Sequence, residues 1–97
     1  MAEKVDDTLK ERGDVYGDYK GGLEYRKGLE TLMNNRYFQV HGKDMPDKDM
    51  FLFNDIFAKL SRLAVTPRHQ DSMHDLAGYA LLVEEVIKNE KADNITP

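Results

Sequence analysis

Apolar residues recur every three or four positions over most of the chain from residue 19 onward. This spacing is the period of an α-helix, and it predicts three long helices, at residues 19–40, 47–65 and about 70–90. A short helix over residues 2–12 is also expected, although Val5 and Leu9 are its only apolar pair. No segment of strand length alternates apolar and polar residues. The sequence therefore predicts an all-α fold, a small helical bundle in a single domain over residues 1–97.

Glycine and proline mark the ends of these helices. Gly42 follows the first helix, Pro46 suits the start of the second, and Pro67 ends it. Because only a short polar turn follows Pro67, the last two helices are expected to run antiparallel. Residues 91–97 are expected to form a disordered tail.

Two apolar faces are expected to form the core. The second long helix contributes Phe53, Ile56, Phe57, Leu60, Leu63 and Ala64, and the last contributes Met73, Leu76, Ala77, Ala80, Leu81, Val83 and Ile87. Mid-helix glycines cost about 1 kcal/mol each relative to Ala. Gly21, Gly22 and Gly28 therefore suggest the close approach of another backbone or a ligand, with fraying of the first turn as the alternative for Gly21 and Gly22. Gly78, next to Ala77, would allow tight packing of a second helix.

Composition narrows the class of protein. The chain has 97 residues, a net charge of −4, 40% hydrophobic residues and no cysteine. Disulfides and cysteine-bound zinc are excluded, and no apolar run is long enough for a membrane span. We therefore expect a cytoplasmic protein, in the host cell if it is phage-encoded. The net negative charge argues against binding duplex nucleic acid and favours a small ligand or a protein partner. A chain this short also favours a partner subunit.

Charged residues on the last two predicted helices could carry chemistry. Asp55, Lys59 and Arg62 share one helical face, off the main apolar stripe, where the two cations could hold a phosphate. The alternative is an exposed Asp–Lys pair. Asp71 and Asp75, at i,i+4, are candidate ligands for Mg²⁺. The alternative for them is helix capping plus a salt bridge to Lys59 or Arg62 across the hairpin.

Aromatic and histidine side chains could complete such a site. Tyr16, Tyr19 or Tyr79 could stack on a nucleotide base, although tyrosines are also common half-buried core residues. Arg68 could add to the phosphate contacts. His69 and His74 are poorly spaced for two metal ligands on one helix, so a metal site is not expected there. Instead, His69 or Asp75 is expected to donate or accept hydrogen bonds with the ligand.

The segments ERGDVYGDY, KLSRL and HQDSMHDLAGYALLVE resemble a group of small phage-encoded all-α proteins. The combination is similar to the phage nucleotide-modification-associated domains and, more distantly, to the MazG-like NTP pyrophosphohydrolases. The resemblance implies a MazG-like helical bundle that forms a dimer or larger oligomer and handles nucleotides. The matching positions are Tyr16, Gly17, Asp18, Lys59, Arg62, Asp71, Asp75 and Tyr79.

The chain departs from the MazG-like pattern at its metal site. Those hydrolases resemble one another in an E-E-x-x-E segment followed by E-x-x-D, which together hold Mg²⁺. Here the first of these helices offers Asp55, Lys59 and Arg62, and only Asp71 and Asp75 remain on the second. A hydrolase without its carboxylates would bind metal poorly.

Three hypotheses follow. The first is a nucleotide binder without hydrolysis, which sequesters a cyclic nucleotide or ADP-ribose-type immune signal as an anti-defence protein. The second is a Mg²⁺-dependent nucleotide pyrophosphohydrolase, with Asp71 and Asp75 as metal ligands and a further carboxylate from Glu84, Glu85 or a partner chain, or an accessory protein of nucleotide modification. The third is an inhibitor that binds a host enzyme.

Overall fold

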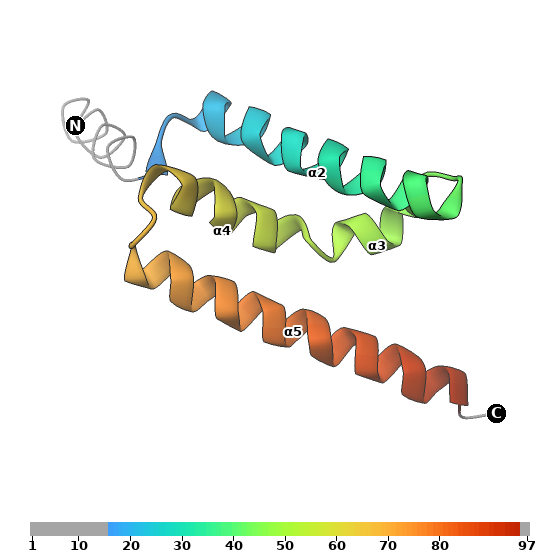
Figure 1. The fold of residues 1–97 in the computed structure, drawn as a ribbon. Coiled ribbons are helices and arrows are strands. Elements are labelled where there is room, and N and C mark those ends of the chain that lie inside the picture. Colours follow the sequence, from blue (N-terminus) through green and yellow to red (C-terminus); the bar gives the residue numbers. More distant parts are fainter. Residues whose placement is uncertain (1–15, 96–97) are drawn as a thin grey trace, which may run out of the picture.

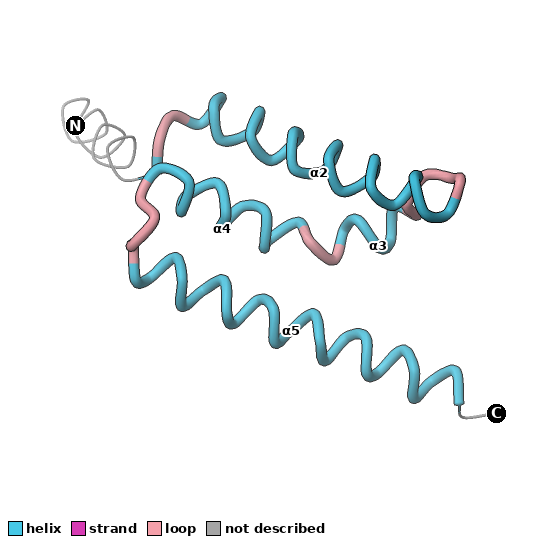
Figure 2. Tube along the Cα trace, viewed as in Figure 1, coloured by secondary structure: helices cyan, strands magenta, loops and turns pink. Residues whose placement is uncertain are grey.

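The computed structural model describes residues 16–95. Within this range the chain forms four helices, α2 (Tyr19–His41), α3 (Asp47–Phe51), α4 (Asn54–Val65) and α5 (Gln70–Ile95), and no strand. Figure 1 shows α4 lying between α2 and α5, and Figure 2 shows the short loops that join the helices. The predicted all-α class is confirmed. The predicted helix over residues 2–12 lies outside the described residues.

α2 begins and ends where local chemistry dictates. The side chain of Asp18 caps its first turn, because Oδ2 accepts a 2.8 Å hydrogen bond from the Gly21 N–H. Gly42 ends the helix with a φ of +70°, and its N–H donates to the Phe38 carbonyl over 2.8 Å. The stop predicted at Gly42 is therefore confirmed.

The second predicted helix is broken into two. α3 ends at Phe51, where hydrogen bonds from Leu52 to Asp49 and from Phe53 to Met50 tighten the chain into a turn with i→i+3 bonds. Phe53 has φ −95° and ψ 0°, outside the helical region, and α4 begins at the next residue. The prediction of one continuous helix over 47–65 was wrong, because apolar spacing continues unchanged across this turn.

α4 and α5 form the predicted antiparallel hairpin, with α5 running back along α4 (Figure 1). α5 continues to Ile95, so the prediction of a tail from residue 91 was wrong for 91–95. The sequence has no glycine or proline between Gly78 and Pro97 that would stop the helix earlier. No helix in the described part of the chain is long and apolar enough to cross a membrane.

The core is much smaller than the apolar pattern predicted. Phe57 and Leu63 are the buried hydrophobic residues of the described chain, and Phe53, Ile56, Leu60, Leu76 and Val83 are half-buried. The remaining positions expected in the core are exposed: Ala64, Met73, Ala77, Ala80, Leu81 and Ile87. Their burial was predicted from period alone, but among the described helices only α4 covers α5 extensively.

The glycines within α2 and α5 differ in what surrounds them. A Cβ on Gly22 would lie 3.2 Å from Ser61 Oγ, and that hydroxyl donates to the Gly22 carbonyl over 3.4 Å, so close approach of α4 is confirmed there. A Cβ on Gly21 would meet the capping carboxylate of Asp18 at 2.7 Å. A Cβ on Gly28 or Gly78 would meet no other part of the described chain within 4 Å, so the close contacts predicted for these two are not formed there.

Candidate phosphate-binding site

The candidate site lies at one end of the bundle. There the start of α2, the end of α4 and the start of α5 come together (Figure 1). Tyr16, Arg62 and His69 approach one another at this end because the turn 66–69 is short and the segment before α2 lies beside the end of α4. A Cβ on Gly17 would be 2.9 Å from Val65 Cγ2, which shows how closely the two segments approach.

The Tyr16-Gly17-Asp18 segment holds the start of α2 in place. Gly17 adopts a φ of +80°, a conformation that side chains disfavour. Asp18 is used as the helix cap. The half-buried Tyr16 ring lies against two neighbours: the Arg62 guanidinium carbon is 4.6 Å from the ring centroid, and the His69 ring meets Tyr16 edge-on at 5.6 Å. The roles of Gly17 and Asp18 are thus conformational, which the sequence motif alone did not reveal.

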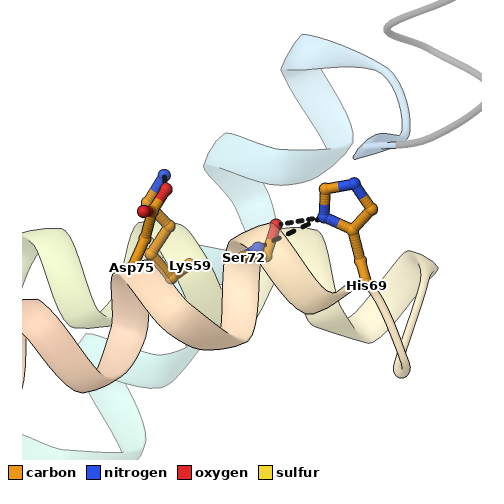
Figure 3. Close-up of polar contacts among 4 residues, drawn as sticks. All are labelled: Lys59, His69, Ser72 and Asp75. Atoms are coloured by element: carbon orange, nitrogen blue, oxygen red, sulfur yellow. Dashed lines mark hydrogen bonds and ion pairs between the residues drawn. The ribbon is translucent and has the colours of Figure 1, made fainter.

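Lys59 is buried, contrary to the expectation that it lies off the apolar stripe beside Asp55. Its side chain is only 11% exposed, and Nζ donates to Asp75 Oδ2 over 3.0 Å (Figure 3). Nζ also lies 5.9 Å from the centroid of the half-buried Tyr79 ring. The alternative of a salt bridge from Asp75 across the hairpin is confirmed, and Lys59 is committed to joining α4 and α5.

The pKa of Asp75 is lowered mainly by the hydrogen bond from Lys59. Partial desolvation acts in the opposite direction, and the positive charges of Lys59, His74 and Arg62 add to the lowering. The carboxylate therefore stays ionised and neutralises Lys59. With Oδ2 engaged by Lys59 and the ammonium charge 3.0 Å away, the carboxylate has less affinity for a second cation such as magnesium.

His69 caps the first turn of α5. Its Nδ1 accepts from the Ser72 backbone N–H over 3.3 Å and lies 2.8 Å from Ser72 Oγ (Figure 3). Because Nδ1 is the acceptor, the hydrogen of the neutral ring is assigned to Nε2. Ser72, only 2% exposed, fixes this orientation. His69 therefore offers one N–H donor at the start of the helix.

The other predicted site residues lie on the surface. Arg68, Asp71 and Asp75 occupy exposed positions of the turn and α5, and Tyr19 is 80% exposed at the start of α2. Between Tyr16 and Ile95 no group of three or more His, Asp or Glu side chains is arranged to hold a metal ion. Sequence reasoning missed Ser72, whose burial depends on the closeness of α4.

Comparison of the chain with protein-family models, with curated proteins and with solved structures found no match.

Proposed function

We propose that the chain binds a nucleotide through its phosphate groups and does not hydrolyse it. The observation that carries the proposal is the stacking of the Arg62 guanidinium over the Tyr16 ring at 4.6 Å. Within residues 16–95, ion pairs join Lys59 to Asp75 and Lys88 to Glu84, and none involves Arg62. A guanidinium held by a ring keeps its N–H donors for an anion, whereas one paired with a carboxylate does not.

Other groups at this end of the bundle support an anion near Arg62. His69 offers its Nε2–H, and Arg68 adds a second, exposed guanidinium in the turn. The N-terminal end of α5 carries partial positive charge from the helix dipole. All three features favour negative charge at the same end of the bundle.

Each of the other candidates has a supporting role in this proposal. Lys59 and Asp75 neutralise each other and hold α4 on α5, so they position the site, with Tyr79 beside them. Tyr19 is the exposed ring that would stack on the base. Hydrolysis is disfavoured because Asp75 and Glu84 already pair with lysines, and the described residues contain no group of three carboxylates or histidines arranged to hold a metal.

The resemblance to phage-encoded proteins extends the proposal to a biological role. A small protein that binds a nucleotide signal without consuming it lowers its free concentration in proportion to the protein present. A cyclic nucleotide or an ADP-ribose-type signal of bacterial immunity has the phosphates and base that this site would recognise. The chain would then act as an anti-defence protein.

Titration calorimetry against a panel of mono-, di- and cyclic nucleotides and ADP-ribose tests this function. Arg62→Gln is expected to weaken binding by about 10- to 100-fold, because a hydrogen bond to a charged group contributes about 1.5–3 kcal/mol. Arg36→Gln is the matched control, since Arg36 is an exposed arginine of α2 that contacts Gln39 instead. Absence of binding at micromolar concentrations, or equal loss in both variants, would refute the proposal.

Release of phosphate or pyrophosphate in the same samples with Mg²⁺ would show hydrolysis. That result would overturn the non-hydrolytic part of the proposal while leaving binding intact.

A further inference from the structure

An apolar groove opens between α4 and α5 at the end of the hairpin away from the candidate site. Its walls are Phe53 and Ile56 on one side and Ala80, Val83 and Ile87 on the other. The groove is open to solvent and has a volume of about 560 Å³. Phe53 stacks on the buried Phe57 with 5.9 Å between ring centroids, so the groove continues the core outward to the surface.

The groove is bordered by charges of both signs from one helix. Glu84, Lys88 and Lys91 form its rim on α5. Glu84 and Lys91 are seven residues apart, so they lie on the same face of the helix about 10.5 Å apart. If two α5 helices cross antiparallel near Ile87, Glu84 of each copy faces Lys91 of the other. A two-fold axis makes both contacts at once.

We propose that this groove is the interface of a homodimer, and that the second copy packs its own α4–α5 groove against it. Of the described residues, only Phe57 and Leu63 are buried apolar side chains, and the chain has no cysteine with which to form a disulfide. A helical chain of this size needs additional support beyond so small a core. An isologous contact supplies it by turning two open hairpins into a four-helix arrangement with a shared interior.

A second copy fits the groove better than the chain's own N-terminal segment does. That segment is attached at Tyr16, at the opposite end of the hairpin, and its periodic apolar residues are only Val5 and Leu9. A partner must present an apolar face as broad as the groove. Its acidic and basic residues must also run in the reverse direction, so that each meets the opposite charge on the rim. The α4–α5 hairpin of another copy has both.

Charge reversal tests the proposal on the full-length chain with analytical ultracentrifugation. At micromolar concentrations, the molar mass measured for the wild type is expected to be twice the chain mass of 11.2 kDa. Glu84→Lys and Lys91→Glu each create two like-charge contacts across the two-fold axis. Each variant alone is expected to dissociate at least about tenfold more readily.

Mixing the two variants restores both attractive pairs, so the mixture is expected to form a heterodimer. Glu84→Lys also breaks the 2.9 Å ion pair with Lys88 inside one chain, but that intrachain loss is not repaired by mixing. Rescue therefore identifies an intermolecular contact. A monomeric wild type would overturn the proposal, as would single variants that remain dimeric or a mixture that fails to associate.

A substitution at the centre of the proposed interface gives a second measurement. Ile87→Glu places a charge at the centre of the proposed interface and is expected to abolish the dimer. Its far-UV circular dichroism shows whether the helices persist. An Ile87→Glu dimer of unchanged affinity would place the interface elsewhere and refute the proposal.

Discussion

Substitution of Gly17 by Ala tests whether the turn before α2 sets the geometry of the candidate site. Two costs are expected. The φ of +80° disfavours any L-residue by about 1–2 kcal/mol. The new Cβ would also lie 2.9 Å from Val65 Cγ2, and relieving such overpacking costs about 1–3 kcal/mol more. The variant is therefore expected to lose about 2–5 kcal/mol in its free energy of unfolding.

Gly42→Ala is the matched control for the first cost. Gly42 has a similar φ of +70°, but a Cβ there would have no neighbour within 4 Å among the described residues. It should lose only the conformational share of about 1–2 kcal/mol. Urea denaturation at one fixed protein concentration compares the two variants, provided that their m-values agree.

Val65→Ala separates the steric cost from the conformational one. Val65 is 48% exposed, so its truncation alone should cost little. Combined with Gly17→Ala, it should recover the overpacking share, and the double-mutant cycle should be non-additive. Equal stabilities of the Gly17 and Gly42 variants, together with an additive cycle, would refute the assigned crowding. Because Tyr16 adjoins the turn, Gly17→Ala should also weaken nucleotide binding, although it removes no charge.

Two further predictions concern charge and helix propensity. The pKa of Asp75 is lowered, chiefly by the hydrogen bond from Lys59. The ionised Asp75 carboxylate therefore stabilises the fold at pH values above the ordinary pKa of 3.8, and this stabilisation is lost as the pH falls through the lowered pKa. The free energy of unfolding should therefore fall more on acidification for the wild type than for Asp75→Asn. Parallel pH profiles of the two unfolding free energies would contradict this. Gly28→Ala should raise the free energy of unfolding by about 0.4–1 kcal/mol, since a Cβ there meets nothing within 4 Å in the described chain; a loss of stability in thermal denaturation would show that another surface covers Gly28.

Helix positions followed from the sequence because their determinants are local. The 3.6-residue period, Gly42 and Pro67 act within a few residues, so they predicted α2, the end of α4 and the hairpin without knowledge of the fold. The break at Phe53 was missed for the same reason. It changes backbone hydrogen bonds from i→i+4 to i→i+3 without changing which residues are apolar.

Burial did not follow from the sequence, because it depends on which helix lies opposite. Lys59 and Ser72 are buried where α4 and α5 approach, while Leu81 is 67% exposed although its spacing resembles that of a core residue. The pattern identified residues able to be buried. It carried no information on whether the covering surface comes from this chain or from another copy.

The candidate site was predicted in composition but not in the division of roles. Arg62 and Lys59 were equivalent cations on one face. In the structure Lys59 is neutralised by Asp75, whereas Arg62 lies over Tyr16. This difference arises from contacts between segments more than ten residues apart, which spacing within a single helix does not encode.

The positions of the site and the groove make the two proposals separable. Along α5, Ser72 and Glu84 are twelve residues apart, which corresponds to about 18 Å. A change at the rim of the groove should therefore leave the Arg62–Tyr16 contact intact. If monomeric Glu84→Lys binds one nucleotide per chain with unchanged affinity, the site is complete within one subunit. If affinity falls with dissociation and returns on mixing with Lys91→Glu, the second copy supplies part of the binding surface, and the dimer is the functional unit.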